Sequence, residues 1–257
     1  MTPKYLIDIH QHLNFMNSSD EELISHQKNI GASKTILLPA SEKISLDNGL
    51  LANVPNTEIA YNFCKENKSF LFAANFSPDK LYMIEEYINK GAKLIGEIKY
   101  DTSSDSEDMW MYCEVAQQCK VPILIHFENK RGINDLNKFE KTLKKFPNVN
   151  FIGHAVLWWA EIDGMTDKLM KEYKNLYADI SANSGLRAMR KPSAKKFLEN
   201  HQDNILFGSD CPPNHPYVNS PYCIANKCKQ RLDQVCSFEV LEKIYYKNSQ
   251  TLLKISL

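Results

Sequence analysis

Eight short runs rich in β-branched and apolar residues recur along the 257-residue chain, and most are followed by a polar turn and a stretch of helical periodicity. Alternating strands and helices of this length indicate parallel βαβ units. Eight units fit a closed (β/α)8 TIM barrel, an α/β fold, better than an open sheet, so we expect one barrel domain over residues 1–257. The expected strands are residues 5–12, 35–40, 69–76, 93–100, 121–128, 148–156, 176–182 and 204–210.

The segments between these strands carry conventional helix punctuation. Ser19 and Glu22 form a capping-box pattern, and Gly31 provides the stop for the helix that follows them. The remaining helical and loop segments are predicted from periodicity and composition. Helices are expected between Ser77 and Gly91 and within 106–119, 134–146, 163–174, 187–200 and 237–255, and loops within 40–55 and 211–222.

The composition excludes several classes of partner and points to a cytoplasmic protein. The 31 basic residues balance the 31 acidic ones, so no net field favours nucleic acid or a membrane surface. The apolar stretch near the start is too short and too interrupted for a signal peptide, and no run approaches the length of a membrane span. The seven cysteines are scattered and include no C-x-x-C pair, which argues against a disulfide framework and against a thiolate zinc site.

Polar residues gather where the predicted strands end. Active sites of such barrels lie at the C-terminal ends of the strands, so these side chains are expected to meet. In the run "LIDIHQH" (6–12), strict alternation places Asp8, His10 and His12 on one face of the first strand. The other polar residues at or near strand ends are Glu97 and Lys99 on the fourth strand, His126 on the fifth, His154 on the sixth and Asp210 on the eighth.

The types of residue at these ends favour a metal site. Imidazole is the commonest protein ligand for zinc, and catalytic zinc sites combine a few His and carboxylate ligands with an open position. His10, His12, His126 and Asp210 would form a set of three imidazoles and one carboxylate around a divalent ion, with Zn2+ expected and Mn2+ as the alternative. His26 and His201 fall in predicted helices instead. They are assigned structural roles because the sequence places no companion acid beside them.

The sequence resembles the amidohydrolase superfamily of metal-dependent (β/α)8 enzymes. Its hallmark is HxH on the first strand, His on the fifth and sixth, and Asp on the eighth. The segments "IDIHQH", "PILIHFE", "VNFIGHA", "YADIS" and "ILFGSDCP" are similar to the branch that contains aminocarboxymuconate semialdehyde decarboxylase and its lactonase and hydrolase relatives. The closing segment "IYYKNSQTLLKI" is similar to that branch's last helix.

The resemblance implies roles for the site residues but leaves the number of ions at one or two. His154 is either a ligand of a second ion or a hydrogen-bonding group for water or substrate. Glu97 is either a metal ligand, as in the binuclear branches, or the partner of Lys99 in a buried ion pair. Asp210 would act as general acid and base. Asp8, and Asp179 on the seventh strand, are expected to orient an imidazole or to be structural.

Loops after the strands are expected to bind the substrate. Aromatic groups beside a cation suit a small organic molecule that carries a carboxylate. The candidate residues are Lys99, Trp158, Arg187 and His215, with Trp159 next to them in sequence. Each has a structural alternative, such as loop packing, a subunit contact or an exposed helix start.

The predicted function is hydrolysis of a small ester, lactone or amide by metal-activated water. A non-oxidative decarboxylase of a small carboxylic acid would use the same ligands and is the alternative. A nuclease or phosphoesterase is disfavoured by the balanced charge, and a barrel that binds metal or ligand without turnover is a minor alternative because the ligand set is complete. The family resemblance is compatible with a homodimer, although no segment of the sequence shows an interface.

Overall fold

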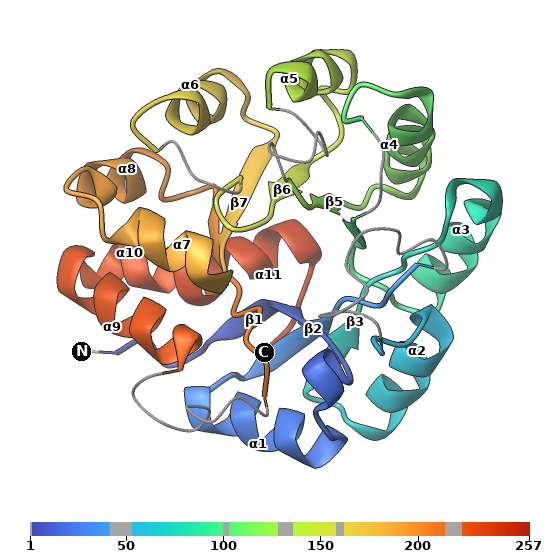
Figure 1. The fold of residues 1–257 in the computed structure, drawn as a ribbon, viewed down its shortest axis with the longest axis horizontal. Coiled ribbons are helices and arrows are strands. Elements are labelled where there is room, and N and C mark those ends of the chain that lie inside the picture. The colour runs from blue at the N-terminus through green and yellow to red at the C-terminus, as the bar shows by residue number, and fades with distance from the viewer. Residues whose placement is uncertain (1, 42–52, 100–102, 128–135, 158–161, 214–222) are drawn as a thin grey trace.

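A computed structural model describes the chain except for residues 1, 42–52, 100–102, 128–135, 158–161 and 214–222. Parallel strands occupy the centre and helices surround them, as predicted for a TIM barrel (Figure 1). The strands are β1 (Ile7–Gln11), β2 (Lys34–Leu37), β3 (Phe70–Phe72), β4 (Ile95–Ile98), β5 (Ile123–Ile125), β6 (Phe151–Gly153), β7 (Leu176–Ile180) and β8 (Ile205–Phe207). Seven of the eight lie inside their predicted ranges, and β2 begins one residue before its range, at Lys34.

The strands form two parallel sheets, β1 to β3 and β4 to β8, joined edge to edge. Ala74, just after β3, forms a parallel bridge with Ile95 in β4. At the other seam the backbone N–H of Asp210 donates to the carbonyl oxygen of His10 at 2.9 Å. This second bond places the end of β8 directly beside the polar end of β1.

Helices cover the outside of the strands (Figure 1). Ser19 and Glu22 form both bonds of the predicted capping box, and Gly31 ends α1 in the left-handed region at φ 80°. The helices are α1 (Asp20–Ile30), α2 (Thr57–Glu66), α3 (Tyr82–Asn89), α4 (Glu107–Cys119), α5 (Leu136–Lys145), α6 (Met165–Glu172), α7 (Ala182–Met189), α8 (Ala194–Asn200), α9 (Ile224–Val235), α10 (Phe238–Glu242) and α11 (Asn248–Leu253). A π-helical turn over Lys243–Lys247 joins α10 to α11.

One helix prediction was wrong, and two helices were missed. The single helix expected at 187–200 is two helices, α7 and α8, and the first begins earlier, at Ala182. Pro192 lies between them and supplies no N–H for a continuous helix. Helices α2 and α9 were not predicted at all. Most of both predicted loops lies outside the described residues.

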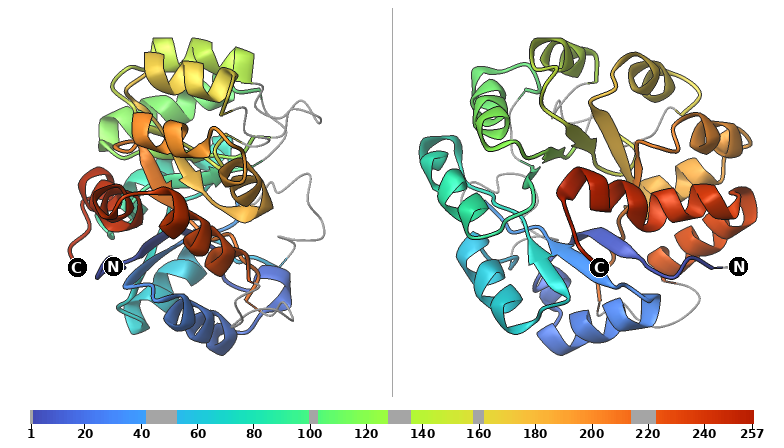
Figure 2. Two further views of the ribbon diagram at one scale, coloured as in Figure 1. Left: turned by 90° about the vertical axis from the view of Figure 1, so that its left-hand side faces the viewer. Right: turned by 180° about the vertical axis from the view of Figure 1, so that it is seen from behind.

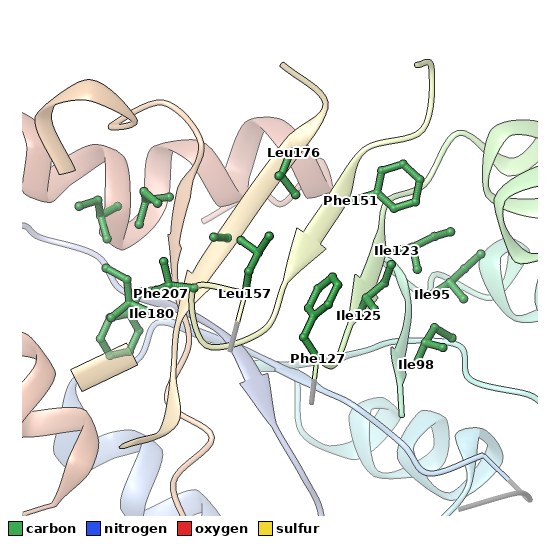
Figure 3. Close-up of a cluster of buried hydrophobic side chains, with 14 of the residues drawn as sticks. Ile95, Ile98, Ile123, Ile125, Phe127, Phe151, Leu157, Leu176, Ile180 and Phe207 are labelled. Atoms are coloured by element: carbon green, nitrogen blue, oxygen red, sulfur yellow. The ribbon is translucent and has the colours of Figure 1, made fainter. Parts of the chain in front are cut away.

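Two apolar layers hold the barrel together. The outer layer packs alternate strand residues against the helices, and Figure 3 shows part of it. The inner layer draws on seven of the eight strands and fills the barrel. Leu253 and Ile255 join this inner layer, and the α10–α11 helix and both termini lie at the same end of the molecule (Figure 2). Burial of these side chains closes one end of the barrel, so only the opposite end is left for a site.

An irregularity in β1 changes which of its side chains enter the barrel. Ile7 and Ile9 both belong to the inner layer, and the pairing with β2 shifts between Asp8 and Gln11. A bulge of this kind lets the next polar side chain, His10, also enter the barrel. The prediction that Asp8 shares a face with His10 was therefore wrong.

Candidate metal centre

The predicted metal ligands meet at the open end of the barrel. Five are almost fully buried, and the Asp210 side chain is 16% exposed. Their positions follow from the strand ends, because parallel strands bring their carboxyl termini to one rim. The six are His10 in β1, His12 just beyond it, Glu97 in β4, His126 after β5, His154 after β6 and Asp210 after β8.

The first group of potential ligands comprises His10, His12, Glu97 and Asp210. The Nε2 atoms of both imidazoles lie 3.6 Å from Oε2 of Glu97. The Asp210 Oδ1 atom lies 3.9 Å from His10 Nε2 and 3.7 Å from His12 Nε2. These separations are too long for hydrogen bonds, but they are close to the ~3.3 Å between two ligands of a tetrahedral ion with bonds of about 2.0 Å.

A second group shares Glu97 with the first. His126 Nδ1 lies at hydrogen-bond distance, 2.7 Å, from Oε1 of Glu97, the other oxygen of this carboxylate, and the pair would separate to bind one ion together. Potential ligand atoms of Glu97, His126 and His154 all lie within 4.8 Å of one another. His154 Nε2 is 3.6 Å from Oδ2 of Asp210, so the two groups are linked by both carboxylates.

Hydrogen bonds on the far side of the imidazoles fix their orientation. His12 donates from Nδ1 to the carbonyl oxygen of Leu38 at 2.7 Å, and His10 donates from Nδ1 to Oδ2 of Asp179 at 2.8 Å. These bonds leave the Nε2 lone pairs facing the carboxylates, as in metal-ligating histidines. His10 Nε2 is buried and has no hydrogen-bond partner among the described residues. A divalent ion would satisfy this nitrogen, so the residues fit a metal.

Charges inside the site shift the pKa values of its members. Burial opposes protonation of His10, but Asp179 and Asp210 outweigh it and raise its pKa well above the usual range. Burial and the charge of His10 lower the pKa of His12 to about 4. Burial favours a neutral Glu97, yet bonds and charges from His10 and His126 keep its pKa well below normal. A negatively charged Glu97 beside a neutral His12 is the state that a metal ion requires, and His10 would release its proton on metal binding.

Asp8 and Asp179, the two acids that were not predicted as ligands, make different contacts. Asp179 in β7 faces the imidazoles and also accepts a hydrogen bond from the backbone N–H of Ala155 at 2.6 Å. Asp8 instead accepts from the backbone N–H of His10 at 3.1 Å and from the N–H and hydroxyl of Ser209 at 2.9 and 2.6 Å. Asp8 therefore ties β1 to the end of β8, which is the structural option that the sequence left open.

Only part of the predicted substrate site can be described. Lys99 lines a pocket beside the site together with His12, Glu97 and Asn75. Arg187 is an exposed residue of α7, and its role stays a prediction. Trp158, Trp159 and His215 lie outside the described residues.

Sequence reasoning missed Asn75, which follows β3. Its side-chain nitrogen donates to the carbonyl oxygens of Pro39 and Glu97, both at 2.9 Å. Its Oδ1 atom is buried without a hydrogen-bond partner among the described residues. The only available signal was its place after the run "SFLFAANF", because an isolated Asn at a strand end is not distinctive.

The histidines assigned structural roles also differ from expectation. His201 does have a companion acid, since its Nε2 lies 2.8 Å from Oδ1 of Asp167. The distance in sequence between α6 and the end of α8 concealed this pair. His26 lies in α1, and its Nε2 is 3.9 Å from Sγ of Cys223.

The fold and the site together define a TIM-barrel protein with buried clusters suited to a divalent metal. The sequence profile of the amidohydrolase family matches residues 53–255, and the chain belongs to this family. The matched segment begins after β2, so it excludes His10 and His12. No curated protein matches the sequence significantly.

Solved structures of the same fold are similar over almost the whole chain. An uncharacterized TIM-barrel protein from Bordetella bronchiseptica has a TM-score of 0.72 at 12% identity, covering 97% of this chain and 98% of its own. A probable 2-pyrone-4,6-dicarboxylic acid hydrolase from Acinetobacter baumannii has a TM-score of 0.68 at 11% identity, with coverages of 97% and 99%. The 5-carboxyvanillate decarboxylase from Sphingomonas paucimobilis has a TM-score of 0.65 at 11% identity, with coverages of 99% and 100%.

These comparisons establish the superfamily and the fold, and the neighbours include both hydrolases and decarboxylases. The reaction is therefore not determined by similarity. Among the described residues, no helix is both long enough and apolar enough to cross a membrane.

Proposed function

We propose that this protein is a metal-dependent hydrolase of a small ester, lactone or amide, with two divalent ions, expected to be Zn2+, bridged by Glu97. The observation that carries the proposal is the position of the Glu97 carboxylate between two groups of imidazoles. One oxygen faces His10 and His12 at 3.6 Å, and the other contacts His126 at 2.7 Å. A carboxylate that serves two ligand groups suits a pair of ions that share it.

The bound metal would lower the pKa of a coordinated water and so supply a nucleophile near neutral pH. Asp210 is the catalytic acid and base in this proposal. Its carboxylate lies between the nitrogen atoms of His12 and His154 and is the most exposed of the six groups. It can accept a proton from the attacking water and return that proton to the leaving group.

Two residues of the adjacent pocket would position the substrate. Lys99 offers a cation for a substrate carboxylate, which agrees with the dicarboxylic acid named for one structural neighbour. Asn75 Oδ1 offers an acceptor for a substrate N–H or O–H group, which would satisfy a buried oxygen that has no partner among the described residues. The preferred substrate is therefore a small molecule with a carboxylate beside the bond that is cleaved.

Decarboxylation is the second candidate, because a decarboxylase has the same fold over the whole chain. The two reactions differ in the fate of water. We would incubate zinc-loaded protein in H2(18)O with simple esters, lactones, amides and aromatic carboxylic acids, and analyse products by mass spectrometry. Incorporation of 18O into a product carboxylate, absent in Asp210→Asn, would support hydrolysis. Release of CO2 without a solvent oxygen in the organic product would contradict it and establish the decarboxylase.

A further inference from the structure

A second cluster of potential ligands lies on the other side of the segment that follows β8. It consists of His26 in α1, Cys211 directly after Asp210, and Cys223 at the start of α9. The three residues are 0%, 2% and 4% exposed, and one potential ligand atom from each lies within 4.8 Å of the others. The proposed hydrolytic site uses none of them.

The spacing of the cluster is close to that of a metal site. The His26 Nε2 and Cys223 Sγ atoms are 3.9 Å apart. A tetrahedral zinc ion with bonds of about 2.3 Å to sulfur and 2.0 Å to nitrogen would hold them roughly 3.6 Å apart. A small movement of side chains would therefore complete the geometry.

The position of Cys223 favours its thiolate form. It is the N-cap residue of α9, and its Sγ accepts a hydrogen bond from the backbone N–H of Asn226 at 3.4 Å. The partial positive charge at a helix N-terminus stabilises an anion there. A thiolate is the form of cysteine that binds metal.

Gln27 can set the tautomer of His26 that a metal requires. The side-chain nitrogen of Gln27 lies 3.1 Å from Nδ1 of His26, and its side-chain oxygen accepts a hydrogen bond from the Thr35 hydroxyl at 2.8 Å. Exchange of the amide oxygen and nitrogen by a half-turn keeps both contacts, because the hydroxyl can donate or accept. His26 Nδ1–H then donates to the amide oxygen, and Nε2 is left free as a ligand.

We propose that Cys211, Cys223 and His26 form a structural site for a thiophilic divalent ion such as Zn2+. The two thiols would lose their protons to solvent on binding, and a water would take the fourth position. The ion would join Cys211, directly after Asp210, and the start of α9 to α1. It would also hold the Cys211 carbonyl, which accepts a hydrogen bond from the Gln11 amide at 2.9 Å, and so stabilise the backbone beside Asp210.

The test is reconstitution of the reduced, metal-free protein with Co2+, followed by absorption spectroscopy in the near ultraviolet. Thiolate ligands give cobalt an intense charge-transfer band, whereas the hydrolytic centre contains only nitrogen and oxygen donors. The band is expected in the wild-type protein and in the control Cys119→Ser, a half-buried cysteine of α4. It should be lost in Cys223→Ser and in Cys211→Ala.

Absence of the band from the wild-type protein, or its persistence in both cluster variants, would overturn the proposal. Cys223→Ser keeps a favourable N-cap residue, so its fold should survive. A Cys211–Cys223 disulfide in protein purified without reductant, seen as a mass lower by about two hydrogens that reductant restores, would also overturn it. None of these readouts depends on turnover, so failure of the proposed hydrolysis would not affect them.

Discussion

At the scale of single residues, the protonation and orientation of each imidazole depend in part on the group that its Nδ1 atom contacts. His10 is held by the charged carboxylate of Asp179, whereas His12 is held by the neutral carbonyl of Leu38. Burial lowers the pKa of both histidines, but the charges of Asp179 and Asp210 outweigh it at His10 and raise the pKa there. At His12, burial and the charge of His10 prevail, and the pKa falls. The residues behind the ligands are therefore as important as the ligands themselves.

Replacement of the acid behind His10 should weaken metal binding. In Asp179→Asn the side chain keeps one acceptor oxygen but loses the charge that makes His10 basic. Metal affinity is expected to fall by about 10- to 100-fold, as measured by competition with a chromophoric chelator. Asp203→Asn, a change in an exposed aspartate, is the control. Equal affinity in the Asp179→Asn variant and the wild-type protein would show that Asp179 is only structural.

The general acid and base is tested by a substitution of the same size. Asp210→Asn should lower kcat by about 10²- to 10⁴-fold, because Asn cannot transfer the proton of the attacking water. The circular dichroism spectrum and the Tm should stay close to those of the wild-type protein, since the backbone bond from residue 210 to His10 is kept. A variant with undiminished kcat would remove Asp210 from the mechanism.

At the scale of elements, irregular strands bring the ligands into the barrel. The pairing of β1 with β2 shifts after Asp8, and the pairing of β4 with β5 shifts between Ile95 and Ile98. Gly96 makes the second shift feasible, because it has φ +129° and a Cβ there would lie 2.4 Å from the Leu124 carbonyl oxygen. Bulges beside active sites commonly redirect a side chain in this way.

The sequence predicted the eight strands and the meeting of six polar residues because both follow from periodicity and from the shared rim of parallel strands. It could not predict the bulge in β1, since "LIDIHQH" alternates perfectly and the shift lies in the pairing of β1 with β2, which periodicity does not determine. For the same reason Asp8 was assigned to the wrong face. The His201–Asp167 pair and the cluster of His26 with two cysteines were missed because they join segments far apart in sequence.

The close contact of β8 with β1 predicts a specific defect. A Cβ on Gly208 would lie 2.8 Å from Cβ of His10 and 3.3 Å from Oδ2 of Asp179. Gly208→Ala should therefore displace His10, destabilise the fold by about 1–3 kcal/mol and weaken metal binding, as followed by urea unfolding and chelator competition.

The matched control for this change is Gly91→Ala. A Cβ at Gly91 meets nothing within 4 Å, but φ of +109° strains any other residue there. This variant should lose stability without losing metal affinity. If Gly208→Ala bound metal as tightly as Gly91→Ala, the proposed contact between β8 and the site would be wrong.

At the scale of the whole molecule, the barrel buries ionisable groups in its interior, and Leu253 and Ile255 close one end of that interior. A metal that binds the folded chain but not the unfolded chain would stabilise the fold. Without the metal, the buried histidines and carboxylates interact only with one another. The stability of the metal-free protein should therefore depend strongly on pH.

His12 gives this dependence a direction. Its pKa is about 4 in the fold against 6.5 for the free side chain, so the unfolded chain binds a proton first. The metal-free protein should lose stability as the pH falls from 6.5 to about 4, by on the order of 1 kcal/mol per pH unit. Urea unfolding of the metal-free proteins at several pH values should show this loss of stability in the wild-type protein, and His12→Asn should lack it. Parallel curves would mean that His12 is not held neutral by the fold.

The metal content of the barrel is the quantity that decides between the two enzyme classes. It is measured by elemental analysis of zinc-reconstituted protein in the Cys223→Ser background, which removes the proposed thiolate site. We expect about two equivalents per chain, falling to about one or fewer in Glu97→Ala, with Glu97→Gln as a second variant should the first not fold. One equivalent, unchanged by either substitution, would contradict a bridging Glu97 and favour the decarboxylase, and no bound zinc would contradict a metal-dependent enzyme altogether.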